Sequence, residues 1–178
     1  MKGIIVFGAA GSGTTTIAQA LAQHFNLKHI DVDEYAWLDT DIPKAGRVPH
    51  AERVPILQHA INTCEGFVMS GSICGWGDIL IPQFDLAVFV TTPTDIRLKR
   101  LQKREFEQFG DRILEGGDMY EHYCWFINYA STYDNGNPPD RCHKLHEEWI
   151  KLLLCSIISI DGTTPIEKII EQFQKSLI

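Results

Sequence analysis

Short apolar runs alternate with helix-period segments along the whole chain. These runs are rich in β-branched residues and occupy 4–7, 28–32, 66–72, 85–90 and 156–160. Strands that alternate with helices predict a parallel sheet covered on both faces. The run 85–90 is apolar along its length, as is typical of such a strand. The sequence therefore predicts an α/β fold of three layers, with about five parallel strands and a ligand crevice at their carboxyl ends.

Helical periodicity fills the segments between these runs. Ile17, Leu21 and Phe25 share one face of a helix expected over 13–25. Two further helices are expected to begin with a capping box and an early proline, at 92–95 and 164–167. The remaining helical segments are 52–64, 143–153 and part of 105–137.

The glycine-rich stretch after the first strand fits the phosphate-loop pattern G-x-x-x-x-G-x-[ST] through Gly8, Gly13 and Thr15. Glycines let backbone N–H groups turn toward an anion, and the N-terminus of the next helix adds partial positive charge. Thr15 stands where the pattern places a hydroxyl on Mg²⁺. The expected nucleotide contacts are Gly8, Ala9, Ala10, Gly11, Ser12, Gly13, Thr14, Thr15 and Thr16. A glycine-rich turn that binds nothing is the alternative, and the flanking strand and helix disfavour it.

One position departs from the pattern, because Thr14 stands where the motif has lysine. That ammonium normally reaches the β- and γ-phosphates. A positive charge on the transferring group must therefore come from elsewhere in the chain, or not at all.

Three other residues are candidates for the chemistry. Asp33 follows the second strand, where a carboxylate can hold a magnesium water or accept a proton from an attacking hydroxyl. A solvated acidic turn or a helix cap is the alternative for Asp33. Arg100 and Arg104 lie four residues apart, hence on one helical face, and are candidate substitutes for the missing lysine. A solvated basic face is their alternative.

Composition narrows the classes of partner. The 178 residues suffice for one domain over 1–178, and the net charge is −7. This charge disfavours general binding to nucleic acid or to anionic membranes. No apolar run reaches the roughly 18 residues of a membrane span, and no signal-peptide pattern opens the chain. We expect a cytoplasmic protein that acts on a small molecule, with no nucleic-acid or membrane partner; a homodimer is left open.

The five cysteines are odd in number and include no C-x-x-C pair, which is typical of incidental thiols in a reducing compartment. Cys142, His143 and His146 could serve as metal ligands. No second ligand pair stands at a suitable spacing, so a metal centre there is not expected.

Four features in order make the chain resemble the P-loop small-molecule and nucleoside-monophosphate kinases. They are the loop 8–15, Asp31-x-Asp33, Arg100-x-x-x-Arg104 and the closing 160–162. The loop Gly11 to Thr16 is similar to that of archaeal-type cytidylate kinases, which also lack the lysine, and to that of uncharacterised bacterial P-loop ATPases. By resemblance to adenylate kinases, Arg100 would stack on the base, Arg104 would contact phosphates, and Arg112 would be a lid arginine in a helical insertion over about 105–137.

The chain also departs from that resemblance. Ser70-Gly71-Ser72 replaces the Asp-Gly-Phe-Pro-Arg of adenylate kinases, and arginines are few in the insertion. The nucleoside-monophosphate acceptor therefore stays open. The acceptor side is expected over 33–50, 70–78 and 112–135, where Trp76 and Asp78 could line a pocket or belong to the core.

Together these features predict a phosphotransferase that moves the γ-phosphate of Mg·ATP to a small-molecule or nucleoside-monophosphate acceptor. Asp33, Arg100, Arg104 and Arg112 would act on the transferring group, and Thr15 with Asp33 would hold Mg²⁺. A non-catalytic nucleotide-binding regulatory protein is the main alternative, favoured by Thr14. A hydrolase that moves a partner is a weaker one.

Overall fold

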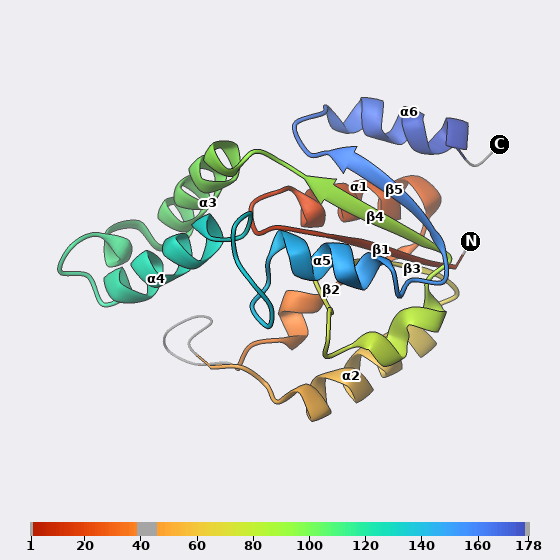
Figure 1. Ribbon diagram of the computed structural model, residues 1–178, viewed down its shortest axis with the longest axis horizontal. Helices are drawn as coiled ribbons and strands as arrows, with labels where there is room; N and C mark the ends of the chain where they lie inside the picture. Colours follow the sequence, from red (N-terminus) through yellow and green to blue (C-terminus); the bar gives the residue numbers. More distant parts are fainter. Residues whose placement is uncertain (1, 39–45, 177–178) are drawn as a thin grey trace.

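The computed structural model describes residues 2–38 and 46–176. Its five strands form one parallel sheet in the order β2-β3-β1-β4-β5 (Figure 1). The strands are β1 (Gly3–Gly8), β2 (Lys28–Asp31), β3 (Phe67–Ser70), β4 (Leu86–Thr91) and β5 (Ser156–Asp161). The α-helices are α1 (Thr14–Phe25), α2 (His50–Asn62), α3 (Thr94–Phe109), α4 (Tyr120–Ser131), α5 (His143–Ile150) and α6 (Ile166–Ser176). The predicted three-layer α/β fold is confirmed.

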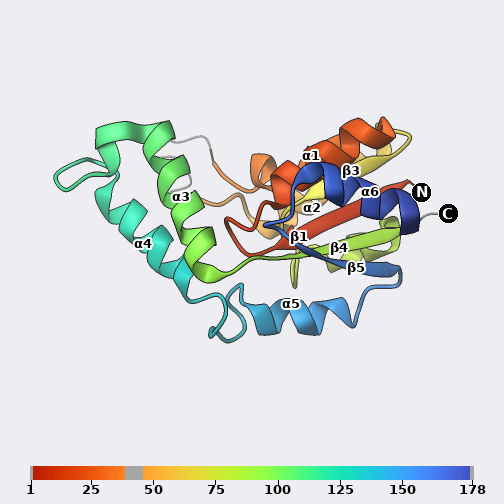
Figure 2. The same cartoon turned by 90° about the horizontal axis from the view of Figure 1, so that it is seen from above.

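Helices cover both faces of the sheet (Figure 2), and an apolar layer of side chains packs at each of these interfaces. On one face, α1 and α6 pack through Leu21 and Phe173 against alternate residues of β1 and β4. On the other face, α2, α5 and the short helix η2 (Asp78–Gln83) cover the remaining residues. There, Phe7 stacks on Phe89 at 5.2 Å and meets Trp149 edge-on at 5.0 Å. Both faces of β1 are thus buried, which explains its unbroken apolar sequence.

The helices α3 and α4 lie beyond the carboxyl ends of the strands (Figures 1 and 2). A short helix, η3 (Gly110–Ile113), connects α3 to the turn before α4. The first part of the predicted insertion 105–137 therefore continues α3, and α4 forms its centre. Whether this pair of helices moves as a lid stays a prediction. The start of β1 and the end of α6 lie at the opposite end of the sheet.

The predicted capping box at 92–95 is wrong. The residue that precedes α3 is Pro93, and no side chain in the described part of the protein caps the helix there. The Thr92 hydroxyl instead donates to the Ser12 carbonyl at 3.1 Å and to the Thr91 carbonyl at 2.8 Å. The Thr92 hydroxyl therefore connects the end of β4 to the glycine-rich loop.

Some boundaries of helices and strands also differ slightly from those expected. Residue 32 begins the short helix η1 (Val32–Tyr35) rather than ending β2, and α5 stops at Ile150. The loop expected over 35–51 gives way to α2 at His50, and its residues 39–45 lie outside the described part. Within that part, no helix is both long and apolar enough to cross a membrane.

Candidate nucleotide site

The glycine-rich loop joins the end of β1 to the start of α1 in a conformation that requires glycine. Gly11 and Gly13 have φ angles of 79° and 99°, in the left-handed region. A Cβ on Gly8 would lie 2.3 Å from the Val90 carbonyl oxygen. Among the described residues no side chain caps α1, and its first turn carries no acidic residue. Its N-terminal N–H groups are therefore left for an anion, as a phosphate loop requires.

A narrow cavity of about 90 Å³ opens over this loop. The loop residues that line it are Gly8, Ala9, Ala10, Gly11, Thr14 and Thr15. The remaining lining residues are Asp31, Asp33, Trp37, Arg47, Gly71, Arg104, His122, Trp125, Phe126, Tyr129 and Arg141.

Two carboxylates reach this cavity from the end of β2. The Thr15 hydroxyl donates to Asp31 Oδ2 at 3.4 Å, and the Asp33 amide donates to Asp31 Oδ1 at 3.0 Å. Asp31, not Asp33, is therefore the carboxylate beside Thr15. The prediction from sequence names Asp33, although Asp31 is the last residue of β2 and pairs with Ser70, which is a usable signal.

The donor set fits Mg²⁺. Hydroxyl and carboxylate oxygens are its preferred protein ligands, and it commonly takes only one or two carboxylates when nucleotide phosphates complete its coordination. Among the described residues, no group of three or more His, Cys, Asp or Glu could hold a metal ion by itself. Thr15 with Asp31 or Asp33 would thus hold the ion only together with a nucleotide.

The three predicted arginines lie in different places. Arg104 lines the narrow cavity, where its Nη2 pairs with Glu105 at 2.7 Å. Arg100 lies on the other side of the loop and donates to the carbonyls of Gly162 at 3.1 Å and Ser12 at 3.4 Å. Arg112 pairs with Asp118 at 2.8 Å and is not among the residues that line the narrow cavity.

Arg100 belongs to a second cavity on that side of the loop. This cavity of about 270 Å³ is lined by Gly13, Thr16, Ile17, Arg100 and residues 162–166. A Cβ on Gly162 would lie 2.2 Å from the Ser12 carbonyl oxygen, so the turn after β5 packs directly on the loop. The glycine-rich loop therefore has a cavity on each side.

A third cavity of about 370 Å³ adjoins the narrow one, and Arg47, Trp125, Tyr129 and Arg141 line both. Its other lining residues are Ser72, Cys74, Trp76, Pro139, Asp140 and Leu145. Trp76 thus lines a pocket. Asp78 instead accepts a hydrogen bond from the indole N–H of Trp149 at 2.8 Å. Neither Arg47 nor Arg141 belongs to a motif that the sequence reveals.

Comparison with known proteins identifies the family. A profile described as an AAA domain matches residues 4–116, more than half of the chain. The chain belongs to this P-loop family. The uncharacterized protein YqaC of Bacillus subtilis is 39% identical over 171 residues, which cover 96% of this chain and 94% of that protein.

Two more distant comparisons connect this P-loop family member to kinases. Cytidylate kinase of Pyrococcus horikoshii is 28% identical over 153 residues, covering 74% of this chain and 76% of that protein. A shikimate kinase structure from Bacteroides thetaiotaomicron has a TM-score of 0.58 at 19% identity, covering 99% and 98% of the two chains, which shows a shared fold. The predicted resemblance to P-loop kinases is confirmed.

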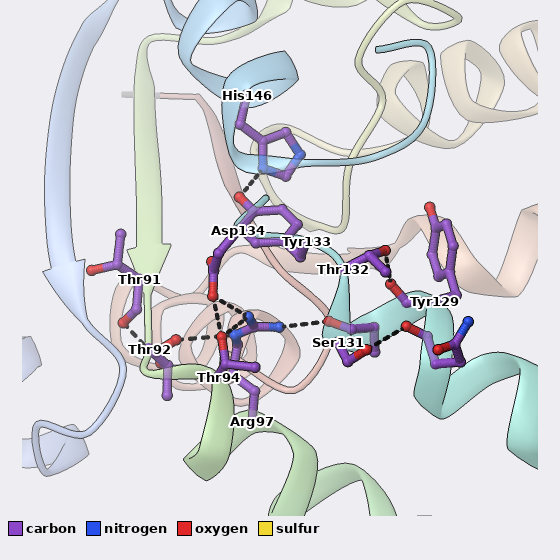
Figure 3. Close-up of polar contacts among 12 residues, drawn as sticks. Thr91, Thr92, Thr94, Arg97, Tyr129, Ser131, Thr132, Tyr133, Asp134 and His146 are labelled. Carbon is purple, nitrogen blue, oxygen red and sulfur yellow. Dashed lines mark hydrogen bonds and ion pairs between the residues drawn. The ribbon is translucent and has the colours of Figure 1, made fainter. Parts of the chain in front are cut away.

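In this P-loop protein, a buried chain of hydrogen bonds runs from Ser72, which lines the third cavity, through His146 to Tyr133; Figure 3 shows the contact between Tyr133 and His146. The Tyr133 hydroxyl lies 2.7 Å from His146 Nδ1, and the Ser72 hydroxyl lies 2.9 Å from His146 Nε2. Burial, and then the positive charge of Arg141, lower the pKa of His146 to about 3. His146 is therefore neutral, and each of its ring nitrogens has a protein partner.

Proposed function

We propose that this protein transfers the γ-phosphate of Mg·ATP to a small anionic acceptor. One observation carries the proposal: four residues line both the narrow cavity over the glycine-rich loop and the larger cavity beside it. A phosphoryl donor held by the loop and an acceptor in the larger cavity would meet there. Most of the rate enhancement would come from this positioning and from positive charge around the transferring group.

The nucleotide would bind across the loop. Its phosphate oxygens would accept hydrogen bonds from backbone N–H groups of the loop and of the first turn of α1. Its base would occupy the cavity of Arg100 and the 162–166 turn, as the resemblance to adenylate kinases implies. Mg²⁺, held by Thr15 with Asp31 or Asp33, would neutralise charge on the phosphate oxygens.

The chemistry of the larger cavity favours an acceptor with an anionic group and a flat or apolar face. Arg47 and Arg141 supply guanidinium groups, and Trp76, Trp125 and Tyr129 supply aromatic faces. Trp125 and Tyr129 stack at 5.5 Å with an interplanar angle of 12°. Nucleoside monophosphates and shikimate-like hydroxy acids meet this description.

A buried cation next to this cavity supports the same conclusion. Arg53 is 3% exposed and lies 4.3 Å above the Trp76 ring. Among the described residues its Nε has no hydrogen-bond partner. Burial, and then the neighbouring charge of Arg47, lower the pKa of Arg53. Two neighbouring arginines with no ion pair to a carboxylate of the described residues favour an anionic ligand.

The test is ADP release from Mg·ATP by the purified protein, alone and with nucleoside monophosphates, nucleosides, shikimate-like acids and sugars. Stimulation by one anionic acceptor is expected. Asp33→Asn, which removes the carboxylate expected to orient the acceptor hydroxyl, should lose most of that stimulation while nucleotide still binds. Nucleotide binding with no stimulation by any acceptor would contradict the proposal.

That last outcome would favour a second function, a regulatory protein that binds nucleotide without turnover. Thr14 is the observation behind it, since the loop itself offers no cation to the transferring group. The two functions differ in whether product forms in the presence of an acceptor.

A further inference from the structure

The sequence position at which the phosphate-loop motif has lysine lies in the wall of the narrow cavity. Thr14 is the first residue of α1 and lines this cavity, so a side chain there faces the place where the β- and γ-phosphates would lie. Its hydroxyl carries no charge. Three arginines line the same cavity from other elements: Arg47, Arg104 and Arg141.

These three arginines differ in how much positive charge they can offer. Arg104 pairs with the buried carboxylate of Glu105, which offsets its charge. Arg47 is exposed, and its guanidinium lies 5.0 Å from the Trp37 ring centroid, at the rim. Arg141 is half-buried, and no carboxylate in the described ranges forms an ion pair with it. Of the three, Arg141 is the one that is partly buried and also forms no ion pair within the described ranges.

The segment that carries Arg141 is fixed at both ends. The His143 amide donates to the Tyr133 carbonyl at 2.9 Å, which closes residues 133–143 into a loop. The Tyr133 hydroxyl lies against His146, and the neighbouring Asp134 pairs with the buried Arg97 at 2.9 Å (Figure 3). These bonds hold the backbone on either side of Arg141.

We propose that Arg141 is a catalytic residue that supplies, from the α4–α5 segment, the positive charge that the loop lacks at Thr14. Its guanidinium contacts the β- and γ-phosphates of the bound nucleotide. A planar fork of N–H donors suits two phosphate oxygens better than a single ammonium does. Tyr133 and His146 are positioning residues, because they hold the segment and do not line the narrow cavity. The inference rests on the proposed nucleotide site.

The test is a double-mutant cycle that moves a positive charge from position 141 to position 14. Nucleotide affinity is measured by calorimetry, without turnover. The proteins are wild type, Arg141→Ala, Thr14→Lys and the double variant; the ligands are Mg²⁺ with ADP or with a non-hydrolysable ATP analogue. Arg141→Ala should lower the affinity for the triphosphate analogue by about tenfold or more, as expected for a lost charge-assisted hydrogen bond. The affinity for ADP should fall by less. Adding Thr14→Lys should restore most of the loss.

Two control variants make the result specific. Lys103→Ala removes an exposed cation of α3, which pairs with Glu107 and lines neither cavity, and should leave both affinities unchanged. Arg141→Gln keeps most of the side-chain packing and should behave like Arg141→Ala if charge is what matters.

Several results would overturn the inference. One is an unchanged triphosphate affinity in Arg141→Ala; another is equal weakening of ADP and the triphosphate. Purely additive effects of the two substitutions would also overturn it, because a relocated charge must be interchangeable with the original. A wild-type protein that binds no nucleotide would instead refute the proposed function itself. The two failures are thus distinguishable.

Discussion

Two segments line the cavity at the carboxyl edge of the sheet, and they keep their shape by different means. Residues 8–16 are shaped by backbone, through glycine φ angles and contacts that exclude a Cβ. Residues 133–143 are shaped by side chains, through Tyr133 with His146 and Asp134 with Arg97. The first segment can be read from a local pattern, whereas the second depends on partners far away in the sequence.

The largest expected effect comes from breaking the backbone-shaped segment. Gly11 and Gly75 have similar φ angles of 79° and 75°, but a Cβ on Gly11 would lie 2.6 Å from the Arg97 carbonyl oxygen, whereas Gly75 has nothing within 4 Å. Gly75→Ala should cost about 1–2 kcal/mol, the penalty of the left-handed conformation alone. Gly11→Ala should cost clearly more, about 3 kcal/mol, and abolish nucleotide binding. Urea denaturation and calorimetry measure both; equal losses would contradict the steric argument.

The next prediction concerns residues 133–143 and the dependence of stability on pH. The pKa of His146 is about 3 in the folded protein and about 6.5 in an unfolded chain. Between these values the unfolded chain binds a proton that the folded protein does not, so stability falls as pH drops below about 6.5. This residue should cost about 2 kcal/mol of unfolding free energy between pH 7 and pH 5.

The check compares wild type with His146→Phe by urea denaturation at both pH values. The variant is less stable at pH 7 but should lose less stability on acidification. The same slope in both proteins would show that another group titrates.

A smaller effect should follow from Tyr133→Phe. Loss of the hydroxyl leaves His146 Nδ1 buried without its partner, at a cost of about 1–2 kcal/mol. Because the 133–143 segment carries Arg141, affinity for the triphosphate analogue should also fall severalfold. Tyr123→Phe in α4, outside this hydrogen-bonded chain, is the matched control. A loss of stability without any loss of affinity would separate the segment from the site.

The smallest effect is expected at Arg112, whose role as a lid arginine stays a prediction. Its exposed pair with Asp118 lies outside the cavities of the loop, and exposed pairs contribute little to stability. Arg112→Ala should leave both the melting temperature and the ATP-analogue affinity unchanged. A marked drop in triphosphate affinity would show that η3 and α4 close over the nucleotide.

The fold and the glycine-rich loop could be predicted because periodicity and glycine rules act over adjacent residues. The capping box at Thr92 failed because a tertiary contact with Ser12 competes for the hydroxyl. Asp31 was passed over for Asp33 because side-chain direction at a strand end is fixed only by the neighbouring turn. Arg141 carried no motif at all. Its position follows from bonds that Tyr133 and Asp134 make to α5 and α3.

Both described ends of the chain lie at the end of the sheet opposite the glycine-rich loop (Figures 1 and 2). A purification tag, a fluorescent fusion or a biotin anchor at either end would therefore sit far from the three cavities. Protein tethered to a sensor surface through such an anchor would present the nucleotide side to solution. The binding cycle on Thr14 and Arg141 can thus be repeated on immobilised protein with little risk that the attachment blocks the ligand.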